Sequence, residues 1–189
     1  YEKCAVYRGS KPVHWCTHDH TALSEAEIEY HDVTSTAIVV RFELTTVPEG
    51  LEAYGGKTWV DIWTTTPWTM PADEAVILHP EANYVGLELP DGHIEIVAEA
   101  LAEKAAAKFG YTDWNLAQDS EGKTWKKTGV ELAGNEYKQP IFGDLGNTGK
   151  FIYADYVTLD DGTGVVHSAP GHGVDDYNAG VRFDIPQTM

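Results

Sequence analysis

Short runs of β-branched and aromatic residues, alternating with polar positions, are the strongest pattern along this chain. Runs of this kind that are separated by turn residues predict β-strands. The dipeptide Asp91-Gly92, preceded by Pro90, lies between two such runs and predicts a hairpin. We expect strands at residues 36–44, 58–66, 74–79, 84–89, 93–97, 138–142, 151–157 and 164–167.

Helical patterns are fewer. Residues 98–109 are rich in alanine and are followed by Gly110, which is typical of a helix that ends at a glycine. A second, shorter helix is expected after residues 171–173, with Asp175 and Asp176 in its first turn, where carboxylates interact favourably with the helix dipole. Many short strands and few helices predict a mainly β fold with a closed, barrel-like core.

Length and composition favour one globular domain over residues 1–189. The chain is 42% hydrophobic, and it contains no internal repeat, no low-complexity tract and no linker that would divide it. It has no apolar run of the roughly 18 residues that span a bilayer, so no membrane partner is expected. The start of the chain lacks Met and a signal-peptide pattern, which predicts a cytoplasmic piece of a longer protein with Cys4 and Cys16 reduced.

Charge argues against strong autonomous binding of nucleic acid. The formal net charge is −17, whereas proteins that grip a phosphate backbone usually present a basic face. Lys123, Lys126 and Lys127 cluster around Trp125. This cluster is interpreted either as a solvated loop or as a small basic patch that contacts phosphate.

Two segments carry unusual chemistry, residues 63–71 and residues 162–177. The first places three consecutive hydroxyl groups at the end of an expected strand, before Pro67 stops the ladder. Threonine is also an ordinary strand residue, so packing and turn formation are an alternative reading of this segment. In the second segment, small residues surround His167 and two carboxylates follow at the start of the expected helix. Packing alone explains this arrangement poorly.

Together these two segments resemble the signature of the editing domain of isoleucyl-tRNA synthetases, which are class I aminoacyl-tRNA synthetases. Residues 11–15 and 22–30 are similar to the entry of that domain, so the resemblance covers nearly the whole chain. Valyl and leucyl relatives carry an Arg in the threonine-rich segment and other residues at His167 and 171–173, which favours the isoleucine type. The family's motifs for the synthetic reaction, His-Ile-Gly-His and Lys-Met-Ser-Lys-Ser, are absent from this sequence.

The resemblance implies a hydrolase that removes valine wrongly attached to the isoleucine tRNA, with valyl-adenylate as an alternative or additional substrate. A synthetic site rejects a smaller side chain by only about 1–3 kcal/mol, a magnitude already established on synthetases of this family, so a second sieve is needed. The implied partners are the 3′-terminal CCA end of the tRNA and the remainder of the synthetase. No cofactor is expected here, since ATP and Mg belong to the larger enzyme, and the isolated domain is expected to be a monomer that binds tRNA weakly.

The resemblance also assigns roles to the charged and imidazole groups. Asp176 matches the carboxylate that binds the α-ammonium group of the substrate. Its alternative role is that of a helix N-terminal acid, which is the role expected for Asp175. His167 matches the side chain that narrows the amino-acid pocket, with a general base or a buried core histidine as alternatives.

The remaining expected site residues are hydroxyl groups and the rings of Trp63 and Trp68, which are expected to be pocket walls or, as an alternative, part of the core. Because an ester is already reactive, positioning a water molecule supplies most of the catalysis, and no Ser-His-Asp triad is required. His172 is expected to orient the terminal adenosine, or to be a turn residue between glycines. Thr66, Thr69 and Asp176 form the expected catalytic set, and the other expected substrate-binding residues are Trp63, Thr64, Thr65, Trp68 and Asp73.

Asp73 departs from the family pattern. The family often has Asn after Pro-Ala at this point, whereas this chain has Asp73 followed by Glu74. If this carboxylate faces the pocket, it is expected to repel phosphate or to compete with Asp176 for the ammonium group.

Three other functions are alternatives. His14, Cys16, His18 and His20, with Cys4 upstream, are possible zinc ligands, although they lack the usual paired spacing. Residues 161–164, Asp-Gly-Thr-Gly, resemble an aspartic-protease motif, but that chemistry needs two such carboxylates and only one copy is present. A non-catalytic module that binds the tRNA 3′ end is the third alternative.

Overall fold

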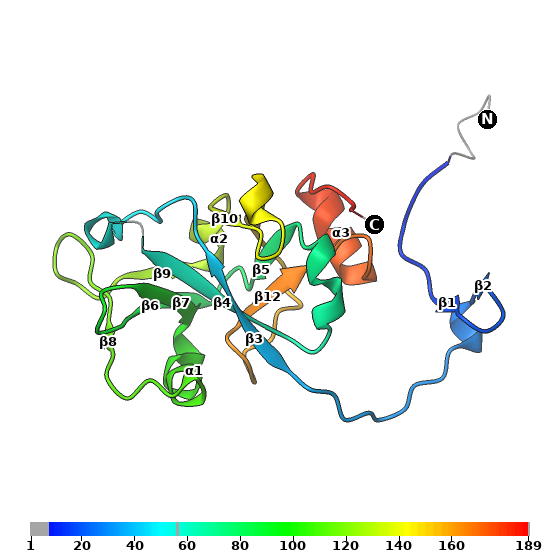
Figure 1. Ribbon diagram of the computed structural model, residues 1–189, viewed down its shortest axis with the longest axis horizontal. Coiled ribbons are helices and arrows are strands. Elements are labelled where there is room, and N and C mark those ends of the chain that lie inside the picture. Colours follow the sequence, from blue (N-terminus) through cyan, green and yellow to red (C-terminus); the bar gives the residue numbers. More distant parts are fainter. Residues whose placement is uncertain (1–7, 56, 189) are drawn as a thin grey trace.

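The computed structural model describes residues 8–55 and 57–188. Residues 8–37 form an arm that extends away from the rest of the molecule (Figure 1). The arm contains a small antiparallel hairpin of β1 (Trp15–Cys16) and β2 (Thr21–Ala22), followed by the 3₁₀ segment η1 (Glu25–Glu27). From β3 onward the chain forms two larger sheets with the helices packed around them.

The larger sheet has the strand order β3-β4-β7-β6-β8, with β9 also paired to β6. All of its pairs are antiparallel except β4 with β7. The turn between β6 and β7 has Gly92 at φ +80°, which confirms the predicted hairpin. Its strands are β3 (Ile38–Glu43), β4 (Thr58–Thr64), β6 (Asn83–Glu88), β7 (Ile94–Ala98), β8 (Asn115–Leu116) and β9 (Lys126–Thr128).

The smaller sheet has the order β10-β11-β5-β12, in which only β11 and β5 are parallel. Its strands are β5 (Ala75–Leu78), β10 (Glu136–Lys138), β11 (Thr148–Tyr153) and β12 (Val165–Ser168). β5 is buried throughout because its two faces pack on different cores. Val76 and Leu78 join the main core between the sheets, and Ala75 and Ile77 pack toward Ala179 of the C-terminal helix.

The mainly β fold is confirmed, but the closed barrel is not. In the part of the chain that the structure describes, the strands form separate sheets and none of them closes on itself. The two larger sheets pack against each other and are also joined at two corners. One corner is the isolated bridge between Leu44 and Tyr137, and the other is the hydrogen bond from Ala98 N to Thr163 O, 2.9 Å long. Side chains of the main core fill the space between the sheets, so burial is achieved without a continuous ladder.

Both predicted helices are present. The 3₁₀ segment η4 (Glu99–Leu101) leads into α1 (Ala102–Phe109), which ends at Gly110 with φ +79°. α1 packs on the outer face of β6 and β7. The second predicted helix is α3 (Val174–Arg182), with Asp175 and Asp176 in its first turn. The short helix α2 (Gly129–Leu132) and the 3₁₀ segments η2 (Glu52–Tyr54), η3 (Pro67–Ala72) and η5 (Gly143–Leu145) were not predicted.

Several predicted strand limits are wrong. The run 138–142 contributes only Lys138 to a strand, because the Gln139 side chain accepts hydrogen bonds from Ile141 N and Phe142 N and turns the chain. The run 151–157 ends as a strand at Tyr153, and strands β8 and β9 were missed. These short strands lack alternation of their own and exist because β6 offers them a partner.

The lysine cluster is paired with acidic side chains. Lys123 Nζ lies 2.7 Å from Glu121 Oε2, Lys127 Nζ lies 2.9 Å from Glu49 Oε2, and Lys126 pairs with Glu99. Trp125 between them is buried in the main core. The cluster is therefore neither a free basic patch nor simply a solvated loop.

The proposed zinc ligands do not converge. Within residues 8–55 and 57–188, no three His, Cys, Asp or Glu side chains are placed to hold a metal ion. Cys16 is a free thiol whose Sγ lies 3.3 Å from both Asp19 Oδ2 and Asp19 N, and Cys4 lies outside the described residues. The helices of the described segments also include none that is long and apolar enough to cross a bilayer.

An ionic cluster on the outer face of the larger sheet joins the exposed Arg41 to two buried carboxylates, Asp61 and Glu95. Arg41 and Asp61 are opposite each other on β3 and β4, with 3.8 Å between Arg41 Nε and Asp61 Oδ1. Glu95 on β7 pairs with Arg41 and accepts a 2.8 Å hydrogen bond from the Tyr111 hydroxyl. Burial, followed by the Glu95 carboxylate, raises the pKa of Asp61 from 3.8 to about 8, against the opposing effect of Arg41.

This pKa predicts that the fold becomes less stable as the pH rises from about 4 to about 8. Between roughly pH 4 and 8 the folded protein keeps a proton that the unfolded chain has lost, so the free energy of unfolding falls as the pH rises through this window. In Asp61→Asn, we expect the fall between about pH 5 and about pH 8.5 to be smaller by about 1–3 kcal/mol. Urea unfolding at the two pH values measures it, with the exposed neighbour Glu43→Gln as the control; equal slopes in both variants would contradict the prediction.

Candidate active site

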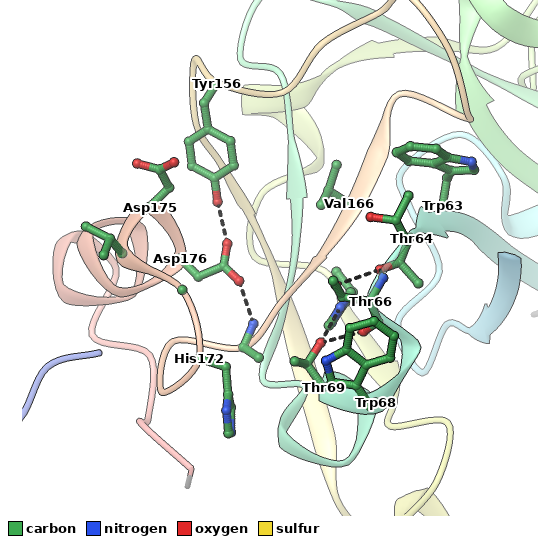
Figure 2. Close-up of a pocket in the computed structure, with 15 residues that line it drawn as sticks. Trp63, Thr64, Thr66, Trp68, Thr69, Tyr156, Val166, His172, Asp175 and Asp176 are labelled. Atoms are coloured by element: carbon green, nitrogen blue, oxygen red, sulfur yellow. Dashed lines mark hydrogen bonds between the residues drawn. The ribbon is translucent and has the colours of Figure 1, made fainter. Parts of the chain in front are cut away.

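The two motif segments, about a hundred residues apart in the sequence, meet at one pocket of about 410 Å³. The end of β4 and η3 provide one side, and β12 with the start of α3 provides the other (Figure 2). The lining residues are Trp63, Thr64, Thr65, Thr66, Trp68, Thr69, Tyr156, Val166, His167, Ala169, His172, Gly173, Val174, Asp175 and Asp176.

The threonine side of the pocket is organised by its own hydrogen bonds. Thr64 Oγ1 accepts a 3.0 Å bond from Thr66 N and lies 3.3 Å from Thr66 Oγ1. Pro67 then begins η3, and Thr69 Oγ1 donates to Thr66 O at 2.8 Å. This tight turn brings hydroxyl groups from the strand end and from the 3₁₀ segment to the same side of the cavity.

His167 forms part of the pocket wall although its side chain is 95% buried. It lies on β12 directly opposite Val76 of β5, which fixes its place in the sheet. Its Nε2 is 3.0 Å from Thr69 Oγ1, so the wall residue and the hydroxyl are held together. This position is compatible with the predicted steric role, and the bond to Thr69 adds a polar one.

The Asp176 carboxylate is held by a donor on each oxygen. The Tyr156 hydroxyl donates to Oδ1 and the Ala169 backbone N–H donates to Oδ2, both at 2.9 Å. Burial, followed by the nearby Asp176 charge, raises the pKa of Tyr156, so the phenol stays protonated and remains a donor. Figure 2 shows this carboxylate on one side of the pocket, with Thr66 and Thr69 on the other.

Aromatic side chains line the edges of the pocket. Trp63 packs against Gly162, where φ is +78° and a Cβ atom would lie only 2.9 Å from the ring, so this glycine makes room for the tryptophan. Trp68 is 71% exposed and lies at the rim. The ring of His172 is also exposed and points away from Asp176 in Figure 2.

Asp73 is the expected site residue that the structure places elsewhere. It does not line the pocket; it is buried behind His167, with Asp73 Oδ1 3.3 Å from His167 Nδ1. The Tyr137 hydroxyl donates to its other oxygen, Oδ2. The expectation that this carboxylate meets phosphate or the ammonium group is therefore corrected, because a side chain of the wall stands between it and the cavity.

The sequence patterns did not indicate Tyr156 as a lining residue, and they indicated only the role of a helix N-terminal acid for Asp175. Tyr156 was placed at the end of an expected strand, whereas β11 ends at Tyr153 and the chain turns to direct Tyr156 toward Asp176. Asp175, expected to be a plain helix-terminal acid, also lines the pocket. No local pattern marks Tyr156, since its partner lies 20 residues later in the chain.

The lining defines which chemistry is available. Among the described residues that form this pocket, there is no serine or cysteine nucleophile. Hydroxyl groups, one held carboxylate and aromatic walls are suited to binding a small cationic group and to orienting a polar bond beside it. The same groups are suited to positioning a reactive ester and a water molecule.

Comparison with known proteins places this chain in a family. Residues 1–177 match the family model of class I tRNA synthetases for I, L, M and V. The isoleucine–tRNA ligase of Fervidobacterium pennivorans is 45% identical over 181 residues, which are 96% of this chain and 18% of that protein. That of Petrotoga mobilis is 41% identical over 180 residues, 95% of this chain and 18% of that protein. The chain thus spans about a fifth of the length of these relatives.

Solved structures share the fold. The crystal structure of GlLeuRS-CP1 superposes with a TM-score of 0.55 at 18% identity, covering 76% of this chain and 58% of the other. The cytosolic leucyl-tRNA synthetase editing domain of P. knowlesi also has a TM-score of 0.55, at 14% identity, covering 75% of this chain and 59% of the other. With its sequence matched over residues 1–177 and its fold shared with these domains, the chain belongs to the class I tRNA synthetase family of the isoleucine, leucine, methionine and valine enzymes.

Proposed function

We propose that this chain is a proofreading hydrolase that cleaves the ester between valine and the isoleucine tRNA. The observation that carries the proposal is the placement of the Asp176 carboxylate, held by Tyr156 and Ala169, in one pocket with the threonine hydroxyls. An aminoacyl ester has a cationic ammonium group close to its reactive carbonyl, and this pocket presents an anion and hydroxyl groups together. The editing-domain fold and the kinship with isoleucine–tRNA ligases support the same activity.

Asp176 binds the α-ammonium group in this proposal. Its two oxygens each accept one bond from the protein, and a carboxylate has further lone pairs for a cationic donor. The protein donors hold the carboxylate in one orientation, so little side-chain entropy is lost when the ammonium group binds. An ester without a free ammonium group would lose this contact.

Thr66 and Thr69 orient the carbonyl, the terminal ribose and the attacking water. The ester needs no protein nucleophile, since fixing a water molecule against the carbonyl lowers the entropic part of the barrier. Trp68 at the rim offers an aromatic face to the terminal adenosine, and His172 is positioned at the same opening.

His167 provides the size limit. The His167 ring is buried and held by its neighbours on both sides, so it cannot move aside for a larger substrate side chain. Overpacking by one methyl group costs about 1–3 kcal/mol. Valine is therefore accepted and isoleucine is disfavoured. Valyl-adenylate presents the same acyl group and ammonium group and is a second substrate under this proposal.

The CCA end of the tRNA is the partner proposed for this pocket. The net charge of −17 and the pairing of Lys123, Lys126 and Lys127 with acidic side chains leave little basic surface for the tRNA body. The remainder of a longer synthetase would then supply most phosphate contacts.

Release of amino acid from charged tRNA tests the proposal. We expect the protein to deacylate valyl-tRNA of the isoleucine type about 10- to 100-fold faster than isoleucyl-tRNA, as one methyl group allows. N-acetylvalyl-tRNA, which lacks the ammonium group, is the matched control and should resist cleavage. Equal rates on all three esters would refute this binding mode, and no cleavage of any ester would favour a non-catalytic 3′-end-binding module.

A further inference from the structure

A chain of polar contacts runs from the core behind the pocket to its threonine wall. The Tyr137 hydroxyl on β10 donates to Asp73 Oδ2, and Asp73 Oδ1 lies 3.3 Å from His167 Nδ1 on β12. His167 Nε2 is in turn 3.0 Å from Thr69 Oγ1, which lies 2.8 Å from Thr66 O. The chain connects a carboxylate that never reaches the cavity with a hydroxyl that does.

Counting protons along this chain gives two arrangements. The Thr69 hydroxyl has one hydrogen, so it donates either to Thr66 O or to His167 Nε2. If Nε2 carries a hydrogen, it donates to Thr69 Oγ1 and the hydroxyl hydrogen points to Thr66 O. If Nε2 is bare, the hydroxyl hydrogen points to Nε2 instead. The tautomer of His167 therefore determines the direction of a hydroxyl in the pocket.

Asp73 is placed to select between these arrangements. His167 Nδ1 and Asp73 Oδ1 are both buried and have no hydrogen-bond partner elsewhere among the described residues. A proton must lie between them, because a bare nitrogen facing an ionised carboxylate would be repelled. When the pair holds a second proton in addition to the one between them, Nε2 carries it; when the pair loses that proton, Nδ1–H faces Asp73 and Nε2 is bare.

We propose that Asp73 is a positioning residue that sets the tautomer of His167 and, through it, the direction of the Thr69 hydroxyl in the pocket. The proposal rests on the proposed function for its catalytic consequence but not for its structural content. With Nε2 bare, a proton of the attacking water passes to Thr69 Oγ1 as the Thr69 proton passes to Nε2, so the water becomes a better nucleophile. With Nε2 protonated, this path is closed.

The surroundings of Asp73 make its charge responsive to pH. Burial raises its pKa from 3.8 to about 6, while hydrogen bonds with His167 and Tyr137 oppose the rise and the neighbouring Glu74 adds to it. These are the ionisable groups that face the carboxylate from β12, from β10 and from its own segment. Activity is therefore expected to increase as the pH rises above about 6 and the pair loses a proton.

Asp73→Asn tests the role without adding volume. The carbonyl of the new amide can accept the Tyr137 bond, which leaves its N–H₂ group to face Nδ1 and fixes the hydrogen on Nε2. We expect kcat for valyl-tRNA to fall about 10-fold at about pH 8, with KM within about 2-fold, and its pH dependence to flatten. Glu74→Gln, which removes a charge one residue away, should keep kcat at about pH 8 and a pH-dependent rate, with the rise moved toward lower pH because Glu74 raises the pKa of Asp73.

Nitrogen-15 NMR of His167 gives a readout that needs no substrate. At about pH 8 we expect Nδ1–H in the natural protein and Nε2–H in Asp73→Asn. The same tautomer and the same pH profile in both proteins would overturn the proposal. If the natural protein cleaves no ester but the tautomers differ as expected, the proposed function fails and the positioning role of Asp73 stands.

Tyr137→Phe keeps the test decisive if Asp73→Asn does not fold. It removes the donor to Asp73 Oδ2, a bond that lowers the pKa of Asp73, and leaves the pocket lining untouched. The pair would then hold its proton to higher pH, so the activity profile should move toward alkaline pH. A profile that does not move would contradict the proposal.

Discussion

Asp176→Asn is expected to reduce kcat/KM for deacylation of valyl-tRNA by about 100-fold, which corresponds to about 3 kcal/mol for a charge-assisted hydrogen bond to the ammonium group. The substitution removes the charge and keeps the shape. Asn can still accept the bond from Ala169 N, and its amide can donate to the Tyr156 oxygen, so both contacts of the residue survive. Steady-state kinetics at saturating and limiting tRNA separate lost binding from lost turnover.

The adjacent acid is the matched control. Asp175 has the same side chain, lines the same pocket and is also in the first turn of α3, but the described residues offer it none of the bonds that fix Asp176. Asp175→Asn should change kcat/KM by less than about 5-fold. Equal losses in the two variants would mean that general negative charge, rather than a held carboxylate, binds the substrate. Unchanged thermal unfolding in both variants excludes a folding defect.

His167→Ala is expected to change selectivity more than any other single substitution in the pocket. Removing the ring opens space beside Val166 and Thr69, so the additional methyl group of isoleucine no longer collides with the wall. We expect the ratio of valyl-tRNA to isoleucyl-tRNA cleavage to fall from about 10- to 100-fold to near unity. The measurement is the rate of each amino acid's release from the same tRNA by the same protein preparation.

The ratio is the informative quantity because the substitution also affects the polar chain. His167→Ala leaves Thr69 and the buried Asp73 without their shared partner, which lowers the absolute rates of both substrates together. Asp73→Asn provides the contrast, since it alters the polar chain but leaves the wall in place and should preserve selectivity. A His167→Ala variant that still rejects isoleucyl-tRNA would place the size limit elsewhere in the pocket.

Local patterns predicted the elements that local chemistry controls. The helix before Gly110 and the hairpin at Gly92 depend on backbone conformations that glycine adopts easily, and both are where the sequence indicated. The alternation of apolar and polar residues indicated the strands of the main core. This signal is also local, because the spacing of apolar side chains along a strand shows which face is buried. The two signature segments were found as functional candidates, and the structure brings them to one pocket.

Long-range packing decided the rest. Whether the sheets close into a barrel depends on which edges find partners, and alternation along one strand carries no information about its neighbour. Tyr156 acquires its contact with Asp176 only because the chain turns after β11, and Asp73 is separated from the cavity by a histidine that is 94 positions away in the sequence, at residue 167. The sequence by itself indicated the family, most strands of the main core and the reactive groups. The tertiary structure decided which of those groups line the pocket and which lie behind its wall. Their placement depends on contacts between distant segments, which no local pattern encodes.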